Sequence, residues 1–70
     1  MEQIEISTDY IKLDQFLKWS GACDNGAMAK SFIIDGLVKV NGNVEIQRGK
    51  KLRNGDIVEF DDKNYEVVQK

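Results

Sequence analysis

The sequence contains no histidine and only one cysteine, and these absences exclude several kinds of functional site. Histidine is the usual acid–base group at neutral pH, so the commonest catalytic side chain is missing. One cysteine without histidine leaves no transition-metal ligand set and allows no internal disulfide. No base lies near Cys23 in the sequence to activate its thiol as a nucleophile. We therefore expect a protein that is not an enzyme and has no metal, cofactor or small-molecule substrate.

The sequence also lacks the segments that mark membrane proteins, secreted proteins and nucleotide-hydrolysing enzymes. No apolar run reaches about 18 residues, so no membrane span is expected. Residues 1–5 are acidic and lack the basic start and apolar stretch of a signal peptide. No G-x-x-x-x-G-K-[ST] phosphate loop is present, because Gly49-Lys50-Lys51 lacks the preceding glycine and the hydroxyl. The single cysteine fits a reducing compartment, and we expect a cytoplasmic protein.

What the sequence does contain is an uneven distribution of charge along one short domain, residues 1–70. The net charge of −2 argues against indiscriminate binding to nucleic acid. Residues 12–53, however, carry eight basic and four acidic side chains, a net charge of +4. Residues 1–11 and 54–70 each carry a net charge of −3. A basic middle between two acidic ends is a first indication of an anionic partner.

The first half of the chain predicts one strand followed by two helices. Isoleucines alternate with polar residues over 3–7, which indicates a short strand. Gly21 ends a first helix, whose buried face has the spacing i, i+3, i+4, i+7: Leu13, Phe16, Leu17 and Ser20. Asn25 is a favourable N-cap for a second helix. Its face has the same spacing and ends at a glycine suited to a left-handed C-terminus: Ala29, Phe32, Ile33 and Gly36.

The second half predicts strands joined by tight turns. Residues 37–40 run into Asn41-Gly42, the strongest two-residue hairpin signal, and residues 44–46 return. Further strands are predicted over 57–60 and 65–68, with turns at Asn54-Gly55 and over 61–64. The predicted fold is therefore α+β: a short N-terminal strand, two helices, then a small curved antiparallel sheet.

The densest basic segment is Gln47 to Arg53, with four positive charges in seven residues: Arg48, Lys50, Lys51 and Arg53. Short basic runs of this kind suit contact with phosphates. Gly49 lies within the segment and would let the backbone approach a phosphate closely. A solvated loop that merely joins two strands is an equally good interpretation of these residues alone.

The two predicted helices supply further candidates for anion binding. Asn25-Gly26 places small residues at a helix start, where free N–H groups and the helix dipole favour an anion. Lys30 lies on the outer face of the same helix, although a plain solvent-exposed face explains it as well. Lys12 and Lys18 bracket the first helix. Trp19 is expected at the edge of the core rather than as a base-stacking surface, because no aromatic array accompanies it.

Many of these residues also form one long pattern, Lys12-Leu13-Asp14-x-x-Leu17, Gly21, Ala29, Phe32-Ile33, Gly36, Val38, Val40-Asn41-Gly42 and Gly55-Asp56. Its spacing, over about residues 10–60, resembles the ribosomal protein S-four-type RNA-binding domain, also called the alpha-L motif. The segments IKLDQFLKW, NGAMAK and QRGKKLRNGD are similar to compact stand-alone members of the YaaA and YbcJ types.

This resemblance implies RNA binding by the two helices and the following hairpin, with structured RNA recognised through shape and phosphates. Many members carry Ser-Arg at the start of the second helix, where this chain has Asn25-Gly26, so that arginine contact is lost here. By position, the basic residues of the family correspond to Lys12 before the first helix, Lys30 on the second helix, and Arg48, Lys50, Lys51 and Arg53 after the hairpin.

The sequence therefore predicts a monomeric, non-catalytic RNA-binding module, with structured RNA, ribosomal RNA or a ribosomal assembly particle as its partner. The ribosomal target follows from the resemblance only. The alternative is a protein-interaction adaptor that uses the same fold, and the acidic flanks and the missing helix arginine favour it. Salt dependence distinguishes the two, because phosphate binding weakens steeply as salt rises.

Overall fold

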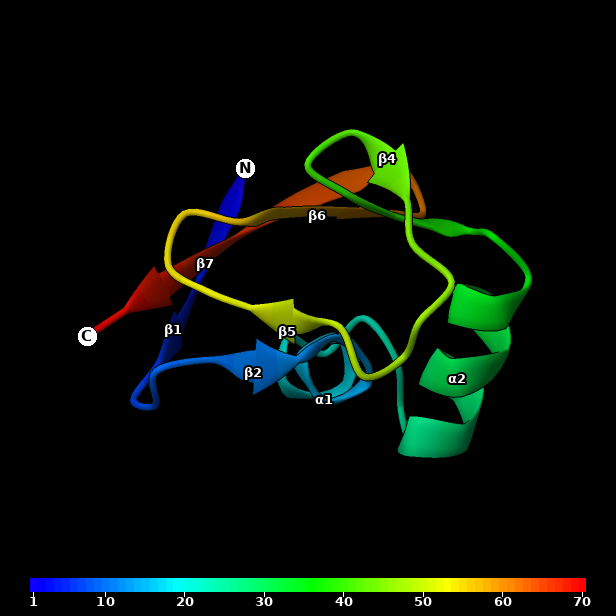
Figure 1. Ribbon diagram of the computed structural model, residues 1–70, viewed down its shortest axis with the longest axis horizontal. Helices are drawn as coiled ribbons and strands as arrows, with labels where there is room; N and C mark the ends of the chain where they lie inside the picture. Colours follow the sequence, from blue (N-terminus) through cyan, green and yellow to red (C-terminus); the bar gives the residue numbers. More distant parts are fainter.

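The computed structural model describes residues 1–70 as two helices, a five-stranded sheet and a separate two-stranded ribbon. Figure 1 shows both helices on one side of the sheet, with the ribbon beside the first helix. In chain order the elements are β1 (Glu2–Ile6), β2 (Ile11–Lys12), α1 (Leu13–Trp19), α2 (Gly26–Ile34), β3 (Val38–Val40), β4 (Asn43–Val44), β5 (Lys51–Leu52), β6 (Ile57–Phe60) and β7 (Lys63–Gln69).

The large sheet has the strand order β1-β7-β6-β3-β4. The neighbouring strands among β3, β4, β6 and β7 pair antiparallel. The edge strand β1 pairs with β7 in parallel, with Ile4 opposite Val67. The antiparallel part was expected, and the parallel edge strand makes the sheet mixed. Two tight turns have positive φ at both central positions, as this kind of hairpin requires: Asn41-Gly42 (52° and 86°) and Asp61-Asp62 (56° and 62°).

The second helix begins and ends where its sequence signals place it. The Asn25 side chain accepts a hydrogen bond from the Met28 N–H at 2.8 Å, which confirms it as the N-cap. At the other end Gly36 has a φ of 79°. The N–H groups of Gly36 and Leu37 bond to the carbonyls of Ile33 and Phe32, the pairing of a Schellman motif. A β-carbon at position 36 would be strained at that φ, so glycine is required there.

The core is entirely apolar and draws on both helices, the sheet and the ribbon. Thirteen residues are buried and none of them is charged. Phe16 of α1 meets Tyr65 of β7 edge to face, with ring centroids 6.3 Å apart. Leu52 of the ribbon is fully buried, a burial that stabilises the fold by about 1.5–3 kcal/mol. The buried residues are Ile6, Leu13, Phe16, Leu17, Cys23, Ala29, Ile33, Val38, Val40, Leu52, Val58, Tyr65 and Val67.

Several local features differ from the expectations drawn from the sequence. The strand after Asn41-Gly42 is shorter than expected, 43–44 instead of 44–46. The final strand begins at 63 instead of 65, because two residues suffice for the turn before it. Trp19 lies outside the core with 66% of its surface exposed. Its indole N–H donates to the Glu5 carbonyl at 2.9 Å, so it ties the end of α1 to the edge strand β1.

Candidate nucleic-acid interface

The β2–β5 ribbon has an inner face in the core and an outer face in solvent. Ile11 pairs with Leu52 and Lys12 pairs with Lys51 in its antiparallel register. Ile11 and Leu52 pack in the core, whereas Lys12 and Lys51 are exposed. Because successive side chains of a strand point to opposite faces, the two lysines lie directly opposite each other on the outer face. The basic segment is therefore more than a connector, since part of it is a strand.

A tyrosine completes this outer face. The Lys51 Nζ lies 4.8 Å and the Arg53 Cζ lies 5.6 Å from the centroid of the Tyr10 ring. Continuing the register by one residue places Tyr10 opposite Arg53, which accounts for these two cation–π contacts. We call Tyr10, Lys12, Lys51 and Arg53 the ribbon face. Tyr10 was missed from the sequence, although its position two residues before Lys12 would have placed both on one face of a strand.

The positive charges of the ribbon face repel one another and lower the stability of the free protein. Two like charges directly opposite each other in a ladder are destabilising, and here Arg53 brings a third positive charge to the same face. The burial of Leu52 on the inner face holds the ribbon in this register. An anion placed between the lysines would remove their repulsion, so the arrangement suits an anionic partner.

The rest of the basic segment folds over the start of α1. The carbonyls of Lys50 and Arg48 accept hydrogen bonds from the N–H groups of Leu13 (2.9 Å) and Asp14 (3.1 Å). These bonds replace a side-chain cap, which Lys12 does not provide. The segment is thereby fixed on the helix, and Arg48, Gly49 and Lys50 remain exposed beside the ribbon face.

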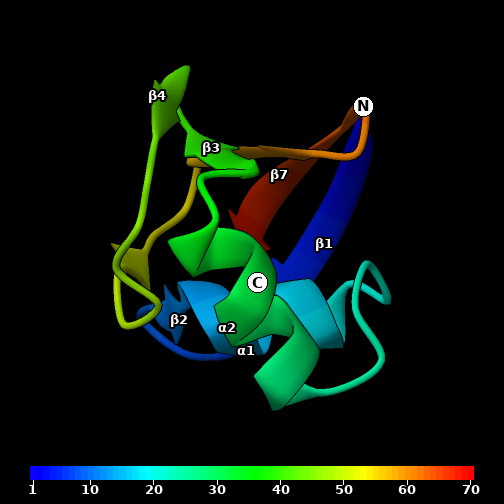
Figure 2. The same ribbon diagram turned by 90° about the vertical axis from the view of Figure 1, so that its right-hand side faces the viewer.

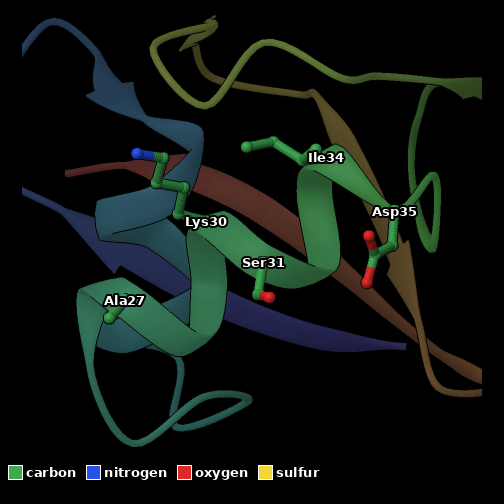
Figure 3. A pocket seen from close by; sticks show the side chains of 5 residues that line it. All are labelled: Ala27, Lys30, Ser31, Ile34 and Asp35. Atoms are coloured by element: carbon green, nitrogen blue, oxygen red, sulfur yellow. The ribbon is translucent and has the colours of Figure 1, made fainter.

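Other predicted site residues lie on α2. Lys30 belongs to its outer face, beside a shallow hollow of about 200 Å³ that is lined by Ala27, Lys30, Ser31, Ile34 and Asp35. Figure 3 shows the Lys30 amine directed away from the Asp35 carboxylate. Phe32 is half-buried and Ile33 buried on the inner side, so the face predicted from the spacing is confirmed.

The start of α2 is open to solvent. The Asn25 side chain accepts its hydrogen bond from the Met28 N–H, whereas the N–H groups of Gly26 and Ala27 have no acceptor within the chain. A β-carbon built on Gly26 would meet nothing within 4 Å, so no neighbour requires glycine there. Figures 1 and 2 both show this helix start apart from the β2–β5 ribbon. The structure thus divides the predicted residues into one group around the ribbon and another on α2.

Lys18 and Cys23 have structural roles that need no ligand. Lys18 is exposed in the last turn of α1, where a cation interacts favourably with the helix dipole. Cys23 is buried, and burial, with a smaller effect of the neighbouring Asp24 carboxylate, raises the pKa of its thiol. A buried thiol that holds its proton is a poor nucleophile. No group of three or more potential metal ligands comes together, and neither helix has the length and apolar character needed to cross a bilayer.

Comparison with known proteins decides the family. The S4 domain family matches residues 4–68. The chain belongs to the S4 domain family. This S4 domain is 43% identical over 58 residues to a probable ribosome maturation protein, RlbA, of Bacillus subtilis (strain 168), covering 83% of this chain and 82% of the relative. It is 37% identical over 59 residues to YbcJ of Escherichia coli (strain K12), covering 84% of each.

Solved structures agree with this assignment. The S4 domain matches the solution structure of YbcJ from E. coli with a TM-score of 0.74 and 33% identity, covering 97% of this chain and 87% of that one. That structure is described as revealing an alpha-L motif involved in RNA binding. The 30S ribosomal protein S4e from Thermoplasma acidophilum shares the fold, with a TM-score of 0.65 and 22% identity over 86% of this chain and 32% of that one. The predicted family and fold class are confirmed, and the site residues stay a prediction.

Proposed function

We propose that this S4 domain is a monomeric, non-catalytic cytoplasmic protein that binds structured RNA, in ribosomal RNA or a ribosomal assembly particle, through phosphate contacts. The observation that carries the proposal is the ribbon face. Lys12 and Lys51 lie opposite each other, and Lys51 and Arg53 lie against Tyr10. The side chains gathered there are three cations and an aromatic ring, and this combination suits contact with phosphates and bases.

The electrostatic cost of the ribbon face supports a phosphate-bearing partner. Lysine ammonium groups act as point charges for phosphates, and each neutralised phosphate releases counterions that favour binding. Arg48 and Lys50 extend the positive surface along the basic segment. Lys30 and the open N–H groups of Gly26 and Ala27 supply a second anchoring point on α2. Two separated points of phosphate contact suit the backbone of a folded RNA better than a small anion.

The relatives support the ribosomal part of the proposal. One of them is named for ribosome maturation and another is described by an alpha-L motif involved in RNA binding. Each match covers more than four fifths of both chains, so most of the domain is compared in each case.

Sedimentation of cell lysate tests this function. The protein, carrying a small epitope tag, should migrate with ribosomal subunits or their precursors in a sucrose gradient at low salt and leave them at high salt. Ultraviolet crosslinking followed by sequencing of the attached RNA should then give reads that concentrate in ribosomal RNA. Crosslinked RNA without ribosomal enrichment would contradict the ribosomal target, and the absence of any crosslinked RNA would contradict RNA binding itself.

A protein-interaction adaptor is the second candidate, and exposed apolar side chains around the end of α2 and the β3–β4 hairpin favour it. A β-carbon built on Gly36 would lie 3.7 Å from the Val44 Cγ1, so the end of α2 and the β3–β4 hairpin lie together. Four large apolar side chains are exposed in this region, each by more than half: Ile34, Leu37, Val44 and Ile46. Apolar contacts respond weakly to salt, so an association that survives high salt would favour the adaptor.

A further inference from the structure

A hollow of about 440 Å³ lies at the margin of the ribbon face and has no assigned role. Tyr10 and Lys12 belong both to the hollow and to the ribbon face. The two cations on the Tyr10 ring, Lys51 of β5 and Arg53 just after it, contribute nothing to the hollow. The complete lining is Thr8, Tyr10, Ile11, Lys12 and Gln15.

Contacts within the protein hold part of the wall of this hollow. The Thr8 hydroxyl donates to the Tyr10 carbonyl at 2.7 Å, which holds the turn before β2. Ile11 packs against the core from the same strand. Lys51 and Arg53 lie against the Tyr10 ring, with the Lys51 Nζ 4.8 Å and the Arg53 Cζ 5.6 Å from its centroid. The ordered part of the wall, the turn before β2 and Ile11, lowers the conformational entropy lost on binding.

The chemistry of the lining matches a nucleotide. Tyr10 is 37% exposed and presents an aromatic surface on which a base can stack. The Gln15 backbone N–H donates to the Asp14 carboxylate at 2.8 Å. The exposed side-chain amide of Gln15 can donate to and accept from a base edge. A phosphate bound by Lys12 would also lie close to Lys51, because the two lysines are paired across the ribbon. A phosphate-only site would need neither the ring nor the amide.

We propose that this hollow takes one unpaired nucleobase of the bound RNA, stacked on Tyr10, with Gln15 at its polar edge and Lys12 at its phosphate. The proposal rests on the RNA-binding function and adds a preference for RNA with an unpaired nucleotide. Unpaired bases are the parts of RNA that aromatic side chains reach, because bases in a helix are already stacked.

Two RNA hairpins that differ by one base test the proposal. Both contain a single-nucleotide bulge in an otherwise paired stem, and in one of them the bulged nucleotide is abasic. The two probes have the same phosphates, so any difference in affinity comes from the base. We expect the protein to bind the probe with the base about tenfold more tightly, equivalent to about 1.4 kcal/mol. Tyr10→Leu should bind both probes with equal affinity.

Trp19→Leu is the matched control, since it removes the other well-exposed aromatic ring and should keep the tenfold preference. Circular dichroism confirms folding of each variant. Equal affinity of the unmodified protein for the two probes overturns the nucleobase site and leaves the RNA-binding function standing. A Tyr10→Leu protein that keeps the preference also overturns it, because the ring then only positions cations. Failure of the unmodified protein to bind either probe overturns the nucleobase site and counts against the RNA-binding function as well.

Discussion

Lys12→Glu is the substitution for which the structure gives opposite expectations for stability and for RNA binding. Lys12 faces Lys51 across the β2–β5 ladder and immediately precedes α1. Glutamate at position 12 would turn a repulsive cross-strand pair into an attractive one, worth roughly 0.2–1 kcal/mol. It would also place a carboxylate at a helix N-terminus, worth about 0.3–1 kcal/mol. We therefore expect the free energy of unfolding to rise by about 1 kcal/mol.

RNA binding should change in the other direction. The substitution removes one cation from the ribbon face and adds an anion that repels phosphate. Loss of one charged hydrogen bond is worth about 1.5–3 kcal/mol, so affinity should fall by at least about tenfold. The slope of log affinity against log salt should shrink by about 0.7–0.9 for the lost contact. If the variant is more stable and binds RNA less well, the positive charge of Lys12 serves RNA binding at the expense of stability.

Thermal unfolding and RNA binding in a salt series measure the two effects. For a domain of this size, 1 kcal/mol corresponds to a rise in Tm of about 4–8 °C. Lys63→Glu is the matched control, because it changes net charge equally and lies at the β6–β7 turn, away from the ribbon in Figures 1 and 2. No gain in stability for Lys12→Glu would refute the argument from the register. Equal losses of affinity in both variants would show that net charge alone matters.

Three further predictions concern the basic segment, α2 and the buried thiol. Joint replacement of Lys50, Lys51 and Arg53 by alanine should leave the stability nearly unchanged, within about 1 kcal/mol, because all three are exposed, and should reduce the salt slope of RNA binding by about one unit per lost contact. Unchanged affinity and slope in the folded variant would remove this segment from the site. Gly26→Arg should fold normally, since its side chain meets open space, and should bind RNA more tightly; loss of binding in a folded variant would show that close backbone approach is essential there. The raised pKa of Cys23 means that the folded state holds the thiol proton more tightly than the unfolded state, so this stabilisation is complete below about pH 8.5 and is lost as the pH rises through the folded pKa. The difference in unfolding free energy between the unmodified protein and Cys23→Ala should change over that alkaline range and stay constant below it, and a parallel course throughout would contradict the shift.

The sequence by itself determined the features that depend on residues close together in the chain. Asn25 marks the start of α2 and Gly36 marks its end, because an N-cap and a left-handed residue act on the adjacent turn of the backbone. Asn41-Gly42 makes its hairpin because both residues tolerate positive φ. The apolar spacing of α1 selected its buried face, since helical periodicity is fixed by local geometry. The concentration of positive charge in Gln47 to Arg53 was equally visible in the sequence.

Only the tertiary structure decided what that charge lies against. A strand of two residues, such as β2 or β5, has no periodicity to detect, and its pairing register is set by burial of Leu52 across a sequence separation of about 40 residues. That pairing brings Lys12 opposite Lys51 and places Tyr10 beneath two cations. The parallel pairing of β1 with β7 likewise joins the two ends of the chain, and no local signal specifies it. Long-range pairing depends on which apolar side chains share the core, and that depends on the whole fold.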